Sequence, residues 1–468
     1  MFDAETYRKR REEVGRAVGK GLILFLGAEE QPVNFAANAY PFRQDSSFLY
    51  FAGIDTPGLR VLLDIDEGVE FLIGRPPDPD AAIWTGIEPS LESLAAPAGI
   101  DRVIGQETSR SRIHAALNAG RKLHYLPPYR ADQVLELVDL TGLSLEKVRA
   151  SASHDLVRAV VSQRSRKSPE EVSEVETALG WTAELFGIVA RGLAPGRNVL
   201  EIAGSLDQRV REWATRMAFP LIMTPHGEIL HGRTEDIVPG PSDLLLVDMG
   251  VESLRHYASD VTRTFPAGGR FSNEQRDIYR IVLGAQTAAI ASAAPGVPFI
   301  DIHREAALVI ARGLRDMGLM KGDPESAVEA GAHALFFPHG LGHLLGLDVH
   351  DMESLGEDSV GYDAEFQRDP RFGFSNLRFG RRLETGQLLT IEPGVYFIPV
   401  LIDRWAAERR FEDFIDYNAV GKFRSFGGVR LEDDILVTES GCRILGPPIP
   451  RSVETIEALV GDRRSMQA

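Results

Sequence analysis

Four acidic residues of this chain stand at the ends of apolar, strand-like runs or inside one. They are Asp248, Asp260, Glu392 and Glu432. The runs 244–247 and 261–265 indicate a hairpin, which would bring Asp248 and Asp260 to adjoining strand ends. Aspartate is also a common turn residue, so these two carboxylates alone leave a purely structural interpretation open.

A further strand-like run, 427–437, carries several charged residues. On one pleated face of this strand, Arg430, Glu432 and Asp434 would point together, because alternate side chains of a strand share a face. A surface ladder of salt bridges is the structural alternative for this strand taken alone.

Three of the chain's 11 histidines fall within the glycine-rich stretch 338–351. They are His339, His343 and His350. Glycines allow tight turns and a close approach of the backbone to a ligand. The stretch does not have the glycine spacing or the lysine of a phosphate loop, and it is not a His-Glu-x-x-His zinc helix. A functional site is therefore favoured over three separate structural histidines.

Four carboxylates that meet in a protein interior require cations. Each unpaired buried charge costs several kcal/mol, so about two divalent ions would be needed to balance four negative charges. A ligand set dominated by oxygen, with one imidazole, suits manganese, cobalt or iron better than a structural zinc site built from thiolates. The residue types thus predict a site for two metal ions.

The elements that must position these residues divide into two expected domains, because 468 residues exceed what one hydrophobic core usually supports. We predict an α/β fold (α+β overall), with one domain over 1–165 and a second over 166–468. Ser168-Pro169-Glu170-Glu171 has the features of a helix start, and 272–275 repeats that capping pattern. A further helix is expected from about 299 to 317. Two long irregular insertions, 351–380 and 397–427, are expected to act as lids or contact surfaces.

Composition excludes several classes of partner. The formal net charge of −17, without a basic stripe, argues against nucleic-acid binding. The charged N-terminal stretch 1–21 lacks the apolar core of a signal peptide, and no segment approaches the roughly 20 apolar residues of a membrane span. Cys442 is the only cysteine, which rules out intrachain disulfides and fits a reducing compartment. We therefore expect a cytoplasmic protein that does not associate with membranes.

The combined motifs resemble a known family. In chain order they are Asp248 with Asp260 before Thr-Arg-Thr-Phe-Pro, His339-Gly-Leu-Gly-His343, His350-Asp351, Glu392-Pro-Gly and Gly-Val-Arg430-Leu-Glu432-Asp433. This order is similar to that of the proline-specific metallopeptidases with the "pita-bread" fold, aminopeptidase P and prolidase. The run 42–51, Phe-Arg-Gln-Asp-Ser-Ser-Phe-Leu-Tyr-Phe, looks like the N-terminal domain of aminopeptidase P. The resemblance covers nearly the whole chain and implies an aminopeptidase P-like N-terminal domain followed by a pita-bread catalytic domain.

The resemblance implies a role for each metal ligand. Asp260 and Glu432 would bridge two divalent ions, with Mn²⁺ the first expectation and Co²⁺, Zn²⁺ or Fe²⁺ as alternatives. Asp248 would bind one ion, and His343 with Glu392 the other. A hydroxide held between the ions would be the nucleophile, and Glu392 would accept its proton.

The same resemblance implies further site residues. His231 would contact the substrate, His350 would stabilise the oxyanion with His339 nearby, and Arg430 would belong to the active site. Trp84, in a Trp-x-Gly motif, would reach the active site of a neighbouring subunit, which implies a homodimer or homotetramer.

Three departures bear on the substrate. Asp248 and Asp260 lie one residue further apart than is usual in the family, and Gly232 follows His231 where an aromatic residue is common. The long segment between Glu392 and Glu432 resembles the corresponding segment of prolidases. Arg378 stands where prolidases place an arginine that holds the free carboxylate of a dipeptide.

The 42–51 run and Trp84 instead favour aminopeptidase P. We therefore expect an Xaa-Pro aminopeptidase that acts on peptides with proline at the second position. A prolidase that cleaves Xaa-Pro dipeptides is the alternative. A metal-free relative that only binds its ligand, or a creatinase-type hydrolase, should lack part of the ligand set, whereas all five ligands are present here.

Overall fold

The computed structural model describes residues 2–80, 82–194 and 196–461, and its chain divides into two compact units. The first unit comprises Met1–Arg164 together with Met352–Ser359, and the second comprises Ser165–Asp351 and Val360–Ala468. The chain therefore passes between the units three times. None of the described helices is long and apolar enough to cross a membrane.

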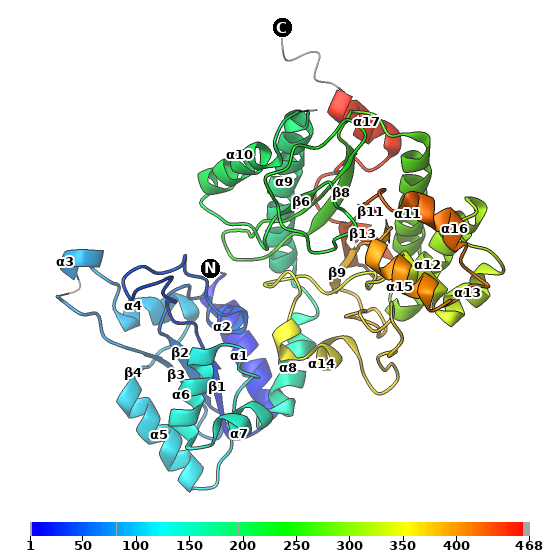
Figure 1. The fold of residues 1–468 in the computed structure, drawn as a ribbon. Helices are drawn as coiled ribbons and strands as arrows, with labels where there is room; N and C mark the ends of the chain where they lie inside the picture. The colour runs from blue at the N-terminus through cyan, green and yellow to red at the C-terminus, as the bar shows by residue number, and fades with distance from the viewer. Residues whose placement is uncertain (1, 81, 195, 462–468) are drawn as a thin grey trace. The chain divides into compact units, whose positions relative to one another are not determined.

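The first unit is built on a five-stranded mixed sheet with the strand order β4-β3-β2-β1-β5 (blue to cyan in Figure 1). The pairs β1–β2 and β2–β3 are antiparallel, whereas β1–β5 and β3–β4 are parallel. The strands are β1 Leu22–Leu26, β2 Arg60–Asp64, β3 Val69–Gly74, β4 Val103–Gly105 and β5 Leu123–His124. The sheet core is apolar and includes Leu24, Leu62 and Leu137.

The helices of the first unit are short or medium in length. They are α1 Ala4–Val18, α2 Ser46–Ala52, α3 Ala82–Thr85, α4 Leu91–Ala95, α5 Gln106–Asn118, α6 Ala131–Thr141, α7 Leu145–Ala150 and α8 His154–Arg164, with the 3-10 helix η1 Ala96–Ala98. The 3-10 helix η3 Glu353–Leu355 also belongs to this unit, although it lies far along the chain. Helix α14 spans Glu357–Gly361, where the chain passes back to the second unit.

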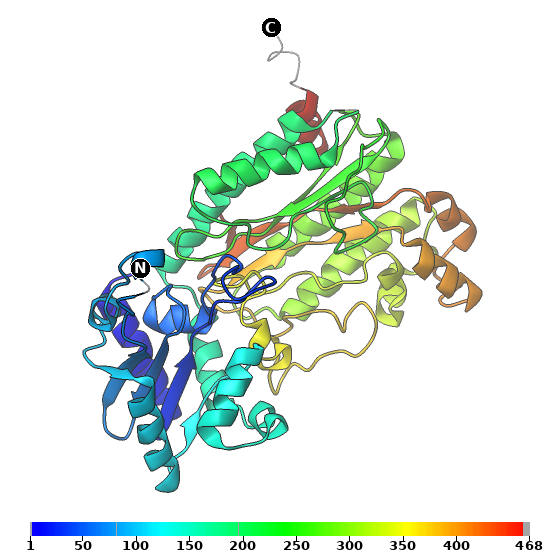
Figure 2. The same ribbon diagram turned by 60° about the vertical axis from the view of Figure 1, so that its left-hand side comes forward.

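The second unit contains the segments that carry the metal-ligand motifs. Its strands form three small groups, β6-β7-β8, β13-β12-β9 and β10-β11. They are β6 Ile222–Thr224, β7 Leu244–Met249, β8 Val261–Pro266, β9 Leu388–Ile391, β10 Gly394–Tyr396, β11 Gly428–Arg430, β12 Asp433–Val437 and β13 Cys442–Ile444. In Figures 1 and 2 these strands lie between the helices α9 and α10 on one side and α11 and α12 on the other.

The two longest helices of the second unit begin where their capping signals predict. Helix α9, Pro169–Gly192, has a capping box of Ser168 and Glu171, and α11, Asn273–Ser292, has one of Ser272 and Gln275. The other helices are α10 Val199–Glu212, α12 Phe299–Asp316, α13 Pro324–Ala330, α15 Pro399–Ala407, α16 Tyr417–Val420 and α17 Val453–Gly461, with the 3-10 helices η2 Ala332–Leu335 and η4 Gly421–Phe423. The predicted helix over 299–317 is confirmed as α12.

The prediction that 397–427 is irregular is wrong. This insertion between β10 and β11 forms α15 and α16, and α15 buries Leu401, Ile402 and Trp405. The Trp405 ring packs edge-on against Phe372 and Phe411. Because burial of these side chains stabilises the helix, its local sequence alone did not reveal it.

Candidate metal centre

The hairpin of β7 and β8 brings the first two carboxylates together. The strands pair antiparallel with Asp248 opposite Thr262, and Asp260 directly precedes β8. Gly250 makes the tight return possible, because a Cβ atom at this position would lie 1.7 Å from the carbonyl oxygen of Ser259. Both aspartates are buried, at 8% and 5% exposure.

The glycine-rich stretch delivers His343 from the other side of the site. A Cβ atom on Gly342 would lie 2.0 Å from the carbonyl oxygen of Thr390, so the chain can run against β9 only with glycine at this position. The pairing is held by Thr390 N–H, which donates to His343 O at 3.0 Å, and by Glu392 N–H, which donates to Leu341 O at 2.8 Å. The same contacts place Glu392 beside the histidine.

The hydrogen bonds of His343 determine which ring nitrogen can bind a metal. Its Nδ1 lies 3.1 Å from the carbonyl oxygen of Leu344, and a carbonyl only accepts, so Nδ1 carries the hydrogen. The lone pair of Nε2 then faces the carboxylates, 3.6 Å from Asp260 Oδ2 and 3.7 Å from Glu392 Oε1. A neutral imidazole in this tautomer is the form that ligates a cation.

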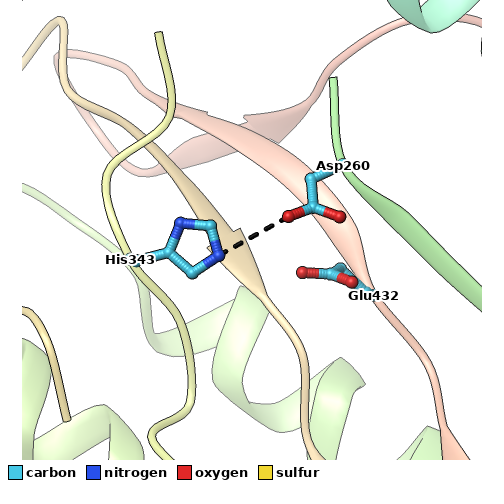
Figure 3. Close-up of side chains that lie close together, drawn as sticks. All are labelled: Asp260, His343 and Glu432. Carbon is cyan, nitrogen blue, oxygen red and sulfur yellow. Dashed lines mark ion pairs between the residues drawn. The ribbon is translucent and has the colours of Figure 1, made fainter. Parts of the chain in front are cut away.

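Asp260, His343 and Glu432 form a buried three-residue cluster, shown in Figure 3. Each offers one ligand atom, and these atoms lie within 4.8 Å of one another. Glu432 is oriented by the hydroxyl of Thr262, which donates to Glu432 Oε2 at 2.7 Å. Asp434 of β12 accepts a hydrogen bond of 3.1 Å from the backbone N–H of Asp260.

The electrostatics of the cluster fit bound divalent cations. Burial, followed by repulsion from Glu432 and Asp248, raises the pKa of Asp260 well above its usual value. Burial and repulsion from Glu392 do the same for the pKa of Glu432, and burial raises the pKa of Glu392 to about 8. Oδ1 of Asp248 and Oδ1 of Asp260 are buried and have no hydrogen-bond partner within the part of the chain that the structure describes. Cations would compensate these charges and satisfy these oxygens, and a set of carboxylates with one imidazole is suited to them.

A network of uncharged and cationic groups borders the carboxylates. Arg430 donates to Asp248 Oδ2 and to the hydroxyl oxygen of Tyr396, the latter at 3.0 Å. Tyr396 lies 2.8 Å from Nε2 of His339, whose Nδ1 is 2.8 Å from the carbonyl oxygen of Gly340. Because Gly340 O only accepts, Nδ1 of His339 donates to it and Nε2 accepts from Tyr396. Burial, reinforced by Arg430, lowers the pKa of His339 to about 3, so this imidazole is neutral.

Tyr396 and Thr262 are site residues that sequence reasoning did not assign. Thr262 lies in the strand-like run 261–265, two residues after Asp260, and Tyr396 lies four residues after Glu392. The only local signal was strand alternation: in β8, the residue two positions after Asp260 shares its face. For Tyr396 the decisive contact, Arg430, comes from β11, which pairs with β10.

The remaining residues predicted for the site lie around the cluster. The ring of the half-buried His350 is 4.3 Å from that of His343. Burial dominates the lowered pKa of His343, to which the charges of His350 and Arg378 add. His231 is exposed, and its neighbour Leu230 packs against a cluster that contains Tyr396.

Trp84 belongs to α3 of the first unit. It is 87% exposed, and Ile83 and Ile87 beside it are 79% and 94% exposed. Its apolar ring is therefore presented to solvent rather than packed into its own unit.

Comparisons with known proteins cover nearly all of the chain. Residues 174–439 match the model of metallopeptidase family M24, and residues 7–124 match that of the aminopeptidase P N-terminal domain. A probable Xaa-Pro aminopeptidase of Uncinocarpus reesii is 30% identical over 98% of this chain and 94% of the relative. One of Aspergillus clavatus is 33% identical over 94% and 93%.

Solved structures agree with the sequence comparisons. A variant of Escherichia coli aminopeptidase P in complex with substrate superposes with a TM-score of 0.81 at 27% identity, over 99% of this chain and 100% of that one. The structure of Pseudomonas aeruginosa aminopeptidase PepP gives a TM-score of 0.80 at 29% identity, with the same coverage.

Proposed function

We propose that this chain, which belongs to metallopeptidase family M24 and carries an aminopeptidase P N-terminal domain, is an Xaa-Pro aminopeptidase. It would remove the first residue from peptides whose second residue is proline. The observation that carries the proposal is the buried cluster of Asp260, His343 and Glu432, with Glu392 beside it. Relatives at 30% and 33% identity bear the name of probable Xaa-Pro aminopeptidases.

The chain's own residues would hold two divalent ions. The ligands are Asp248, Asp260, His343, Glu392 and Glu432, with Mn²⁺ as the proposed metal and Co²⁺, Zn²⁺ or Fe²⁺ as alternatives. When bound, such ions activate water near neutral pH and polarise the substrate carbonyl. The protein orients the ligands: Thr262 holds Glu432, and Arg430 holds Asp248.

Glu392 is the group that would handle the proton. Its side chain stays partly exposed while it lies beside His343, so the carboxylate is within reach of water and substrate and can accept a proton there. His350 would donate a hydrogen bond to the carbonyl oxygen of the scissile bond as that oxygen gains charge. Tyr396 and Gly340 fix the tautomer of the neutral His339, which would border the substrate together with His231 and Arg378.

An Xaa-Pro bond explains why such a site is useful. Proline gives a tertiary amide without an N–H group, so a peptidase that depends on that donor handles it poorly. A shaped apolar pocket can select the ring instead.

Metal binding tests the proposal directly. We expect the purified protein to bind two equivalents of Mn²⁺, measured by calorimetry and by metal analysis. Asp260→Asn should impair both sites, because Asp260 would bridge the ions, whereas Asp248→Asn should chiefly weaken one. Binding of less than one equivalent by the wild-type protein would overturn the two-metal site and favour a protein that only binds its ligand.

A dipeptidase is the second candidate, favoured by the helical insertion 397–427 and by the partly exposed Arg378 near His343. Cleavage of Xaa-Pro dipeptides, Xaa-Pro-Yaa tripeptides and longer peptides separates the two activities. We expect tripeptides and longer peptides to be cleaved. Activity on dipeptides alone would replace the aminopeptidase by a prolidase.

We also propose a homodimer or homotetramer in which Trp84 contributes to a neighbouring subunit's active site, and a cytoplasmic location in keeping with the single Cys442. The exposure of Trp84, Ile83 and Ile87 supports the subunit contact. Trp84→Ala should lower activity on proline peptides and weaken assembly in light scattering, whereas Leu135→Ala, at an exposed apolar position of α6, should change neither. Full activity of Trp84→Ala would remove this role, and cell fractionation tests the location.

A further inference from the structure

Lys167 and Asp351 form an ion pair that is almost completely withdrawn from solvent. Lys167 Nζ lies 2.8 Å from Asp351 Oδ2, and each side chain is only 1% exposed. Both residues belong to the second unit. Lys167 directly precedes the N-cap Ser168 of α9, and Asp351 directly follows His350 in the chain. Neither residue is among the proposed metal ligands.

A buried ion pair of this kind is not needed for stability alone. The attraction of two buried charges is offset by the loss of their hydration, and apolar side chains of similar volume often stabilise such a position equally well. Removing only one partner is destabilising, because it leaves the other charge buried and uncompensated. The position of the pair relative to the site therefore calls for another reason.

Asp351 closes the loop that follows His343. Its backbone N–H donates to Leu344 O at 2.8 Å, and its Oδ1 accepts from the N–H of Asp348 at 3.4 Å. Gly346 packs directly on the ion pair: a Cβ atom there would lie 2.5 Å from Asp351 Oδ2 and 2.8 Å from Cε of Lys167. The loop 344–351 is thus folded around the carboxylate of Asp351.

Lys167, the other partner of the ion pair, is fixed by backbone contacts. The backbone N–H of Lys167 donates to Gly386 O at 2.8 Å, and the capping box of Ser168 and Glu171 begins α9 at the next residue. The loop is also tied to the metal-site hairpin, because Ala258 N–H donates to Gly346 O at 2.8 Å. The ion pair therefore connects a fixed helix start to the loop that ends in His350.

We propose that Lys167 is a positioning residue, which acts through Asp351 to hold the 344–350 loop so that the imidazole of His350 stays beside His343 and faces the substrate. The observed distance of 4.3 Å between the two rings is the geometry that the pair maintains. This inference rests on the proposed function, in which His350 contacts the substrate. Its chemical consequence is a well-placed hydrogen-bond donor without a change in the metal ligands.

A double-mutant cycle on kcat/KM separates positioning from a general structural role. The first arm is Lys167→Met with Asp351→Leu, which removes both charges and leaves neither uncompensated. The second arm is His350→Ala, and the third combines all three substitutions. The substrate is an Xaa-Pro-Yaa tripeptide, and metal content and Tm are measured for every variant.

We expect the uncharged pair to retain its metal and to fold, but to lose kcat by about ten- to a hundredfold, because a misplaced group loses catalytic power steeply with distance. KM should change much less than kcat. The variant that combines all three substitutions should then have nearly the same kcat/KM as His350→Ala alone, because Lys167 acts through His350. Arg166→Met is the matched control, since Arg166 is exposed and pairs with Glu384, and it should leave kcat/KM within about twofold.

Two results would overturn the proposal. The first is an unchanged kcat in the uncharged pair at full metal content. The second is a loss of kcat/KM in the combined variant that equals the product of the losses in the uncharged pair and in His350→Ala. If the uncharged pair does not fold, Lys167→Gln with Asp351→Asn takes its place in the same cycle with the same criteria, because both amides are uncharged and neither partner is left as an unpaired buried charge. A wild-type protein that binds no metal or cleaves no tripeptide would refute the proposed function instead.

Discussion

Two histidines in the second unit should make its stability fall steeply in mild acid. His303 of α12 and His333 of η2 are completely buried, with ring centroids 6.4 Å apart, and both pack against Phe374. None of their four ring nitrogens has a hydrogen-bond partner among the described residues. Burial, reinforced by Arg371, lowers the pKa of His333 to about 3, and burial lowers that of His303 well below its usual value.

The sign and size of the effect follow from proton binding. In the unfolded chain a histidine takes up a proton near pH 6.5. In the folded chain His333 stays neutral down to about pH 3, and the pKa of His303 also lies well below its usual value. Unfolding therefore gains protons as the pH falls below 6.5, and each histidine lowers the free energy of unfolding by about 1.4 kcal/mol per pH unit. Between pH 7 and pH 5 the loss is about 2 kcal/mol for His333, and His303 adds to this loss in the same direction.

Urea unfolding at pH 7, 6 and 5 measures this loss, and His333→Leu isolates one histidine. The variant should lose about 2 kcal/mol less than the wild-type protein between pH 7 and pH 5. The comparison cancels the titration of the metal ligands, which is common to both proteins. His154→Gln, at an exposed histidine, controls for the loss of a histidine at the surface. Parallel pH curves for His333→Leu and wild type would refute the argument that His333 is held neutral.

Three further outcomes test the site. Gly250→Ala should lower metal affinity and Tm, because the added Cβ would meet the carbonyl oxygen of Ser259. Gly204→Ala, which has open space in α10, should instead raise the free energy of unfolding by up to about 1 kcal/mol. Equal melting curves for the two variants would contradict the close contact at Gly250. Tyr396→Phe should lower kcat/KM about tenfold at unchanged metal content, because it removes the hydroxyl between Arg430 and the neutral imidazole; wild-type kinetics would exclude that link. Removal of metal by a chelator should lower Tm and added Mn²⁺ should restore it, since the folded protein binds the ions. A Tm that changes with neither treatment would count against a metal site.

Local signals in the sequence determined several elements correctly. The capping boxes at Ser168 and Ser272 fix helix starts through hydrogen bonds between residues only three positions apart, and the β7–β8 hairpin joins neighbouring strands. Such contacts depend on side chains that are close along the chain, so they can be read without the fold. The alternation predicted for Arg430, Glu432 and Asp434 also agrees with the contacts of all three with the β7–β8 hairpin.

Contacts between distant segments could not be read in this way. The helix α15 depends on the burial of Trp405 against Phe372 and Phe411, and the segment Met352–Ser359 joins the first unit although its neighbours on both sides belong to the second. The partners that stabilise each feature lie elsewhere in the chain, so the sequence alone did not reveal either one.

The sequence by itself determined which chemistry this protein can perform, because four carboxylates and an imidazole in these motifs have the donor atoms that divalent metals require. Only the tertiary structure decided how those atoms are arranged: the approach of His343 to Asp260 and Glu432, the tautomer of His343, and the ion pair of Lys167 with Asp351. The reason is physical. Donor type is a property of one side chain, whereas distance, burial and hydrogen-bond direction arise when strands and loops far apart in the chain pack together.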